Sequence, residues 1–194
     1  MPSGARRGKR AAALAERARR VRLLVMDVDG VLTDGRMVLS ERGDELKFFH
    51  THDGVAVALA KRAGLKTALV TGETSTIAKT RGDKLGVDTV VLGARRKGEV
   101  LDALLASFGL PAAAAAWIGD DLLDVPALER VGLAIAVADA TGPAKAVAHL
   151  VTRARGGAGA VREAVELILE AQGVRRAIVN GYIRDHGGSP ARWR

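Results

Sequence analysis

The stretch that decides the fold lies at residues 21–34 and reads V-R-L-L-V-M-D-V-D-G-V-L-T-D. Its first half is almost entirely apolar, and a short apolar run that ends in a turn is typical of a strand buried in a parallel sheet. Asp27 and Asp29 follow the run directly, and their spacing points both carboxylates to the same side of the chain. The pattern predicts a buried strand at 23–27 with two acidic groups at its carboxyl end.

Short apolar runs alternate with longer segments of helical period in the rest of the chain, as far as residue 172. This alternation indicates an α/β protein with a Rossmann-like, doubly wound, mainly parallel sheet flanked by helices. Further strands are predicted at 67–71, 89–92, 116–118, 133–137 and 150–152. Helices are predicted at 54–63, 75–85, 97–108, 125–131, 143–148 and 160–171, most of them closed by a glycine.

Residues 36–49 break the alternation, because two strand-like runs flank a polar S-E-R-G-D centre. This pattern is typical of a β-hairpin. The segment follows the first strand, so the hairpin should project from the end of the sheet that carries the carboxyl ends of the strands. Active sites of open α/β sheets lie at that end.

The length of 194 residues and a hydrophobic content of 48% favour one folded domain, which we place at 21–173. The formal net charge is +8, but it is concentrated at the ends: residues 1–22 carry +7 and residues 175–194 carry +4, which leaves −3 for 23–174. We predict a flexible basic N-terminal extension over 1–20 and a basic C-terminal tail over 174–194. A mildly acidic body without a basic stripe argues against nucleic-acid binding as the main role.

The composition also indicates in which cellular compartment the protein is expected. No apolar run approaches the roughly 20 uncharged residues that cross a bilayer, and the N-terminus lacks the apolar core of a secretion signal. The chain contains no cysteine, which excludes disulfides and thiolate metal sites. We therefore expect a cytoplasmic protein without a membrane partner.

A second acidic segment, G-D-D-L-L-D at 119–124, follows the predicted strand at 116–118. Asp120, Asp121 and Asp124 should therefore reach the same end of the sheet as Asp27 and Asp29. Taken singly, each segment has an ordinary explanation as a turn or a helix cap. Taken together, five carboxylates repel one another unless a cation relieves them, and Mg²⁺ is a hard ion that prefers carboxylate oxygens. The combination predicts an acidic magnesium pocket.

Two more positions complete a possible phosphate site. Thr71 ends a predicted strand and is followed by Gly72, so a hydroxyl and backbone amides are available for phosphate oxygens. Lys97 opens a predicted helix and can balance the charge of a phosphoryl group among carboxylates. Each signal is weak alone, since Thr-Gly turns and lysines at helix starts are common.

The ordered set D-x-D-G, T-G, K and G-D-D-x-x-D resembles the haloacid dehalogenase-like phosphatase superfamily. Residues 27–35, 119–124 and 156–163, the last reading G-G-A-G-A-V-R-E, are similar to the small phosphatases without a cap domain that act on phosphorylated keto-deoxy sugar acids. The likeness covers residues 21–173. It implies a phosphomonoesterase for an eight- or nine-carbon substrate, 3-deoxy-D-manno-octulosonate 8-phosphate or 2-keto-3-deoxynononate 9-phosphate, and a place in lipopolysaccharide biosynthesis.

The resemblance also implies roles for the acidic residues. Asp27 would attack phosphorus and become an aspartyl phosphate, while Asp29 would act as general acid and then as general base. Mg²⁺ would be held by the Asp27 carboxylate, the Asp29 backbone carbonyl and Asp120, with Asp121 and Asp124 as outer or alternative ligands.

Family members of this kind are tetramers in which the hairpins pack together and a neighbouring subunit closes the site in place of a cap. The resemblance therefore implies a homotetramer built through the hairpin at 36–49. It also implies that Thr71, Gly72 and Lys97 hold the phosphate.

One departure from the family bears on the substrate. Octulosonate phosphatases typically have arginine after the Thr-Gly pair, whereas this chain has Glu73, as in the nononate enzyme. Glu73, Arg81 and Lys84 fall on one predicted helical stripe, which makes them candidates for substrate specificity. The alternative is a surface ladder of salt bridges. Ala158, where octulosonate enzymes often carry arginine, also departs from the pattern.

Two other functions fit the same fold. One is a phosphatase for another small sugar phosphate. The other is a non-catalytic scaffold, because a fold does not fix a function.

Overall fold

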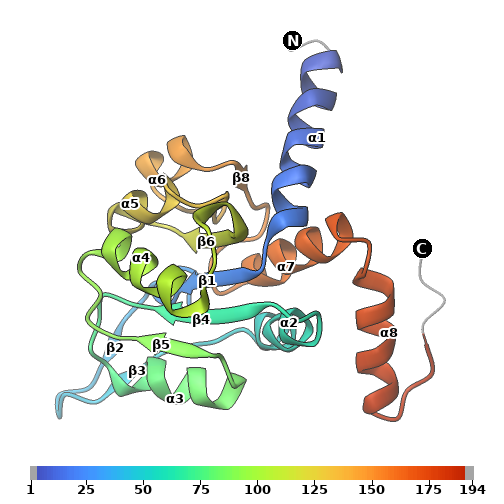
Figure 1. Ribbon diagram of the computed structural model, residues 1–194. Coiled ribbons are helices and arrows are strands. Elements are labelled where there is room, and N and C mark those ends of the chain that lie inside the picture. The colour runs from blue at the N-terminus through green and yellow to red at the C-terminus, as the bar shows by residue number, and fades with distance from the viewer. Residues whose placement is uncertain (1–3, 191–194) are drawn as a thin grey trace.

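A computed structural model describes residues 4–190 and shows an α/β protein built on a six-stranded parallel sheet (Figure 1). The strand order is β5-β4-β1-β6-β7-β8. The bounds are β1 (Leu23–Asp27), β4 (Lys66–Val70), β5 (Thr89–Val91), β6 (Ala115–Gly119), β7 (Leu133–Ala136) and β8 (Leu150–Val151). The predicted fold class is confirmed.

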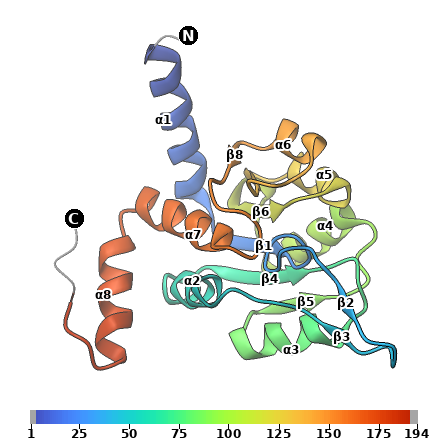
Figure 2. The ribbon, with the colours of Figure 1, turned by 180° about the vertical axis from the view of Figure 1, so that it is seen from behind.

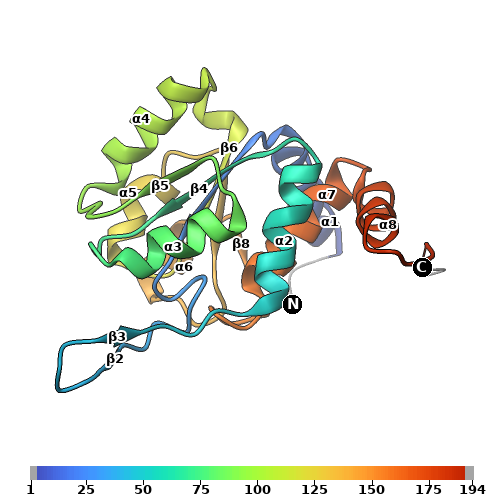
Figure 3. The ribbon, with the colours of Figure 1, turned by 90° about the horizontal axis from the view of Figure 1, so that it is seen from below.

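Helices connect these strands and cover both faces of the sheet. They are α2 (Thr51–Arg62), α3 (Thr76–Leu85), α4 (Lys97–Phe108), α5 (Val125–Leu128), α6 (Gly142–Val147) and α7 (Ala160–Ala171), with short 3₁₀ turns η1 (Ala112–Ala114) and η2 (Leu122–Asp124). The helices α2 and α7 contact each other on one face, and α4 and α5 contact each other on the opposite face (Figure 3). The predicted bounds of the elements between 23 and 171 differ from these by three residues at most, at the start of α2 and the end of α5.

The core is formed where the helices bury their apolar stripes against the sheet. Every residue of β1 and β6 is buried, which explains their continuous apolar runs, and the side chain of Trp117 is fully enclosed. On α7 the buried positions recur at helical spacing, at Ala160, Val161, Ala164, Val165, Ile168 and Leu169. Each large aliphatic side chain buried in this way contributes roughly 1.5–3 kcal/mol.

The order of the strands places three loops around one crevice. The chain leaves β1 for β4 and β5 on one side and then returns to β6 on the other side of β1. In the register of the sheet, Asp27 lies opposite Val70 of β4, and Met26 lies opposite Ile118 of β6. The loops that follow β1, β4 and β6 therefore open at the point where the strand order reverses, which is where open α/β sheets bind ligands.

The predicted hairpin is present and projects from the body of the molecule (Figure 3). It consists of β2 (Val38–Leu39) and β3 (Glu45–Leu46), paired antiparallel. Five apolar residues in or beside the hairpin are exposed: Met37, Val38, Leu39, Leu46 and Phe48. Within residues 4–190 no element forms a cap domain over the crevice.

Both ends of the chain, predicted as a flexible basic extension and a basic tail, contain a helix in the described residues. Helix α1 (Gly4–Arg20) projects from the sheet (Figures 1 and 2), but its last turns are anchored. Ala18 is fully buried, and Arg17 donates to the carbonyl of Gly132 at 2.8 Å. Alanine and arginine have high helix propensity, which explains why a strongly charged segment is helical.

The C-terminal segment also forms a helix, α8 (Arg175–Asp185), which contacts α2 and α7. Residues 1–3 and 191–194, which belong to the predicted extension and tail, lie outside the described part of the chain. The division into a domain at 21–173 with two appended segments stays a prediction. None of the helices in the described part is long and apolar enough to span a membrane.

Candidate active site

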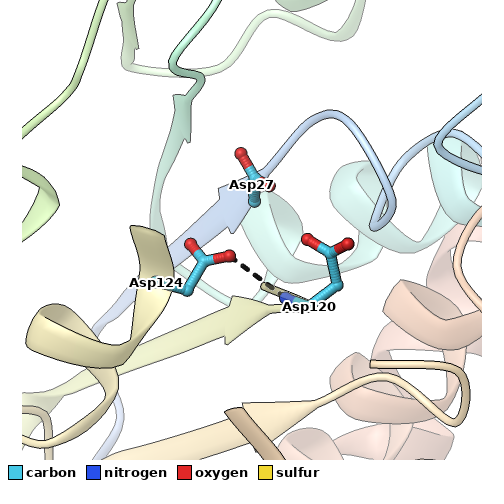
Figure 4. Close-up of side chains that lie close together, drawn as sticks. All are labelled: Asp27, Asp120 and Asp124. Carbon is cyan, nitrogen blue, oxygen red and sulfur yellow. Dashed lines mark hydrogen bonds between the residues drawn. The ribbon is translucent and has the colours of Figure 1, made fainter. Parts of the chain in front are cut away.

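Three carboxylates from two strand ends meet in the crevice. Asp27 ends β1, Asp120 directly follows β6, and Asp124 closes η2 (Figure 4). One oxygen from each of the three groups lies within 4.8 Å of the others. The structure thus brings together the two acidic segments that lie far apart in the sequence.

Lys97 supplies the positive charge of this cluster. Its ammonium lies 2.8 Å from Oδ1 of Asp27 and 2.7 Å from Oδ1 of Asp124, and the residue is 2% exposed. Burial by itself lowers the pKa of Lys97, but the charges of Asp27 and Asp124 outweigh it and hold this pKa above its ordinary value. Lys97 is therefore a buried cation beside Asp27.

Asp124 holds the turn that presents Asp120. Its Oδ1 accepts hydrogen bonds from Lys97 and from the indole Nε1 of Trp117 at 2.9 Å. Its Oδ2 accepts from the backbone N–H groups of Asp120 at 3.1 Å and Asp121 at 3.3 Å. Because both oxygens are engaged, Asp124 acts in this arrangement as a positioning residue. Trp117 could have been noticed in the sequence, since a buried indole N–H needs an acceptor.

The electrostatics of the cluster fit a divalent cation. Burial and the nearby charge of Asp124 raise the pKa of Asp27 well above its usual range, and the same two causes raise the pKa of Asp120 to about 6. Oδ1 of Asp120 is buried without a hydrogen-bond partner among the described residues. A hard dication would stabilise both ionised carboxylates and supply the missing partner, so the side chains present fit Mg²⁺.

The backbone of the loop after β1 is shaped around Asp120. Gly30 has a φ of +92°, and a Cβ atom at this position would lie 2.1 Å from Oδ2 of Asp120. The D-x-D-G pattern therefore needs its glycine for two reasons, a positive φ and close approach to a carboxylate of the second acidic segment.

The predicted phosphate-holding residues lie in the same cleft. Thr71 follows β4 and is 1% exposed. Its hydroxyl donates to Oδ2 of Asp29 at 3.0 Å and accepts from the backbone N–H of Glu73 at 3.0 Å. The cleft has a volume of about 270 Å³ and is lined by Asp27, Asp29, Gly35, Met37, Thr71, Gly72, Glu73, Lys97, Asp120, Asp121, Leu123 and Asp124.

The predicted specificity residues are not brought together. Helix α3 begins at Thr76, after a cap by Ser75, so Glu73 lies in the preceding loop and lines the cleft. Arg81 and Lys84 instead line a separate hollow of about 300 Å³ with Phe49, whose ring centroid lies 5.0 Å from the Arg81 guanidinium carbon. Glu73 lies three residues before the first residue of α3 and therefore outside the predicted helical stripe, and the role of Glu73, Arg81 and Lys84 in specificity stays a prediction.

Lys47 was not among the predicted site residues. Its ammonium donates to Oδ1 of Asp29 and lies 3.0 Å from Oε1 of Glu45, with the side chain 1% exposed. Residues 45–48 alternate polar and apolar, so Glu45 and Lys47 share one face of the strand. That alternation is visible in the sequence, but it does not say which face turns toward the site.

The G-G-A-G segment at 156–159 supports the loop after β1. A Cβ atom on Gly156 would lie 1.7 Å from the carbonyl oxygen of Gly30, and the N–H of Gly157 donates to the carbonyl of Val31 at 2.9 Å. Asp53 anchors the segment, because its buried carboxylate accepts from the backbone N–H groups of Gly159 at 3.1 Å and Arg162 at 2.8 Å.

Known proteins are similar to this chain in sequence and in structure. A model of the haloacid dehalogenase-like hydrolase family matches residues 94–163. The 3-deoxy-D-manno-octulosonate 8-phosphate phosphatase of Yersinia pestis is 40% identical over 157 residues, which cover 81% of this chain and 84% of that protein. This chain belongs to the haloacid dehalogenase-like hydrolases. The enzyme of the same name from Escherichia coli K12 has the same identity and coverage.

Solved structures of haloacid dehalogenase-like hydrolases superpose closely on this one. A subfamily III A hydrolase from Legionella pneumophila has a TM-score of 0.91 and 35% identity, with 93% of this chain and 100% of that chain covered. The 3-deoxy-D-manno-octulosonate 8-phosphate phosphatase of Moraxella catarrhalis, in complex with magnesium, phosphate and KDO, has a TM-score of 0.85 and 34% identity, with 87% and 97% covered. The predictions of the superfamily and of a phosphatase are confirmed.

Proposed function

We propose that this hydrolase is a magnesium-dependent phosphomonoesterase that removes phosphate from an eight- or nine-carbon keto-deoxy sugar acid through an aspartyl phosphate on Asp27. The observation that carries the proposal is the position of Asp27, at the end of a central strand, between Lys97 and the carboxylate of Asp120. The substrate class is supported by relatives that are named for octulosonate 8-phosphate and match most of the chain.

The metal would be held by the carboxylates of Asp27 and Asp120 and by the backbone carbonyl of Asp29. Magnesium bound there would neutralise charge on the phosphoryl group and keep both carboxylates ionised. Asp121 lines the same cleft and would remain an outer group. Asp124 would serve mainly through the turn that it holds.

In the first step, a carboxylate oxygen of Asp27 forms a bond to phosphorus while the bond from phosphorus to the sugar oxygen breaks. The side chain of Asp29 gives its proton to the departing sugar oxygen, which leaves as a hydroxyl. Thr71, the backbone at Gly72 and Lys97 bind the phosphoryl oxygens. Thr71 then exchanges its hydrogen bond to Asp29 for one to phosphate.

In the second step, Asp29 accepts a proton from water as the water oxygen attacks phosphorus. The bond between phosphorus and the Asp27 oxygen breaks, and inorganic phosphate leaves with Asp27 restored as a carboxylate. The buried ammonium of Lys97 offsets negative charge on Asp27 and on the phosphoryl group in both steps.

The experiment that tests this function is hydrolysis of a panel of phosphate esters with Mg²⁺. We expect octulosonate 8-phosphate and nononate 9-phosphate to be turned over with much higher kcat/KM than hexose and pentose phosphates. Equal efficiency on all esters would contradict the substrate class and would leave a phosphatase of broad range.

Glu73 is the proposed determinant of the choice between the two sugar acids, since it lies in the cleft with Asp27. The Glu73→Arg exchange should shift the kcat/KM ratio toward octulosonate 8-phosphate. Glu129→Arg, which makes the same exchange at an exposed position on another loop, is the matched control. An unchanged ratio in Glu73→Arg would remove Glu73 from specificity.

We also propose that the molecule assembles as a homotetramer through the hairpin. The exposed apolar residues of the hairpin support this, because monomeric proteins rarely expose such a patch. Arg81 and Lys84 line a hollow apart from the cleft of their own chain, so a role in substrate binding would require that they face the cleft of a neighbouring subunit.

A further inference from the structure

Lys47 is a charged residue with an enclosed side chain that the reaction described above does not use. It comes from the hairpin rather than from the sheet, yet its side chain is 1% exposed. Its neighbours Leu46 and Phe48 are 60% and 66% exposed. The strand thus turns its charged face inward and its apolar face outward, the reverse of the usual arrangement at a protein surface.

Burying a lysine costs free energy unless its charge is paired. The partners of Lys47 therefore indicate which group the buried ammonium acts on. They are Oδ1 of Asp29 and Oε1 of Glu45. The ammonium is therefore a fixed cation in contact with Asp29.

Asp29 is held from two sides by groups of different elements. Oδ1 is bound by Lys47 of the hairpin, and Oδ2 accepts from the hydroxyl of Thr71 after β4. When phosphate engages Thr71, Lys47 is the side-chain partner left to fix the carboxylate. Glu45 in turn holds the ammonium of Lys47, so both residues of the inward face help to fix the carboxylate of Asp29.

We propose that Lys47 is a positioning residue that holds the carboxyl group of Asp29 in the orientation needed for proton transfer to the leaving sugar oxygen. The inference rests on the proposed function, in which Asp29 is the general acid and base. Misplacing a reacting group by about 1 Å can cost roughly 10²-fold in rate, which makes a constraint on Asp29 significant.

The experiment compares two esters in Lys47→Met, Lys47→Arg and the control Lys79→Met, an exposed lysine paired with Asp83 on α3. A sugar-acid phosphate has a poor leaving group that needs a proton, whereas p-nitrophenyl phosphate leaves without one. We expect Lys47→Met to lower kcat on the sugar phosphate by roughly 10- to 100-fold with a KM close to that of the wild type, and to lower kcat on p-nitrophenyl phosphate much less. Lys47→Arg should restore part of the loss, and Lys79→Met should match the wild type on both esters.

Equal losses on the two esters, or wild-type kcat in Lys47→Met, would overturn the proposal. If Lys47→Met does not fold, Glu45→Gln is the second variant, because it removes the charge that orients Lys47 while keeping the lysine. It should show the same selective loss, and a kcat on the sugar phosphate equal to that of the wild type would count against Lys47. A wild-type protein that hydrolyses neither ester would instead contradict the proposed function.

Discussion

At the scale of single residues, the buried cluster in the cleft carries more negative than positive charge. Asp27, Asp120 and Asp124 bring three carboxylates to within 4.8 Å of one another, and Lys97 is the ammonium that contacts two of them. With every group ionised, two negative charges are left over, which is the charge that one dication neutralises. Burial first, and the nearby charge of Asp124 second, raise the pKa values of Asp27 and Asp120 in the absence of metal.

Asp27→Asn should abolish turnover without unfolding the protein. An amide cannot form the phosphoryl intermediate, and loss of a nucleophile lowers kcat by roughly 10⁴-fold or more. Lys97 keeps Asp124 as a partner, and one repelling carboxylate is removed. In EDTA the melting temperature of the variant should therefore equal or exceed that of the wild type. Turnover that survives the exchange would exclude Asp27 as the nucleophile.

The raised pKa of Asp120 should make the free energy of unfolding of the metal-free protein depend on pH. Its pKa is about 6 in the folded protein, against an ordinary value of 3.8, so the folded state binds the proton more tightly. The resulting stabilisation is complete below about pH 4 and is lost as pH rises through about 6. We expect that, in EDTA, the melting temperature of the wild type falls relative to that of Asp120→Asn as the pH rises from about 4 to above about 6. Parallel pH profiles for the two proteins would contradict the account of the cluster.

Magnesium should reverse this loss at neutral pH. A ligand at 100 times its Kd stabilises a protein by about 2.7 kcal/mol, so saturating Mg²⁺ should raise the melting temperature of the wild type at pH 7.5. Asp120→Asn should respond far less, because the buried oxygen that lacks a partner is part of the removed carboxylate. An equal response in both proteins would place the metal elsewhere.

The sequence predicted which strand-end residues meet in the cleft better than it predicted the residues that contact them. Asp27, Asp120, Thr71 and Lys97 are recognisable because each stands at a strand end or helix start, and parallel strands bring such positions together. The contact of Lys47 with Asp29 depends on how the hairpin folds back, which local periodicity does not determine.

At the scale of elements, the loop after β1 depends on the G-G-A-G segment before α7. The two backbones touch so closely that Gly156 has no room for a side chain, and Asp53 of α2 fixes the far end of the segment through two backbone N–H groups. The segment therefore supports the loop that carries Asp29 and Gly30 and fixes its position. This explains why a motif distant in sequence from the carboxylates accompanies them.

Gly156→Ala should disturb this support. The added Cβ would lie 1.7 Å from the Gly30 carbonyl oxygen, and overpacking of this kind costs about 1–3 kcal/mol. We expect a lower midpoint in urea denaturation and a lower kcat. Gly142→Ala is the matched control, because no atom lies within 4 Å of a Cβ built there. Equal stability of the two variants would argue against close packing of the loops.

Helix α1 lies within the segment that we predicted to be a flexible extension, and that prediction can be tested at its last turns. The positive charge of residues 1–20 suggested a flexible extension, whereas the alanines between the charges form a helix whose end packs on the body. Ala18→Asp should destabilise the protein by roughly 2–4 kcal/mol, because it buries an acidic group at a fully enclosed position. Ala12→Asp, on the exposed part of the same helix, should be close to neutral in the same urea titration. Two neutral variants would mean that the extension is flexible after all.

At the scale of the whole molecule, the open crevice and the exposed hairpin belong together. No cap covers the cleft in residues 4–190, while the hairpin beside it presents an apolar outer face. A second copy packed on the hairpin would bury that face and would also hold Lys47 against Asp29. Assembly and proton transfer would then depend on the same small element.

Leu46→Ser combined with Phe48→Ser should weaken this assembly. Sedimentation velocity at micromolar concentration should show a tetramer for the wild type and smaller species for the double variant, with reduced kcat on the sugar phosphate. Val151→Ser, at an exposed apolar residue on the edge strand β8, should leave the tetramer intact. A wild-type protein that sediments as a monomer would contradict the proposed assembly.

The claim on which all of this depends is that phosphate passes through the side chain of Asp27. Acid quenching during turnover, followed by borohydride reduction and peptide mass spectrometry, converts an aspartyl phosphate into homoserine and locates it. We expect homoserine at position 27, dependent on Mg²⁺ and absent from Asp27→Asn. Homoserine at another aspartate during active turnover would contradict it.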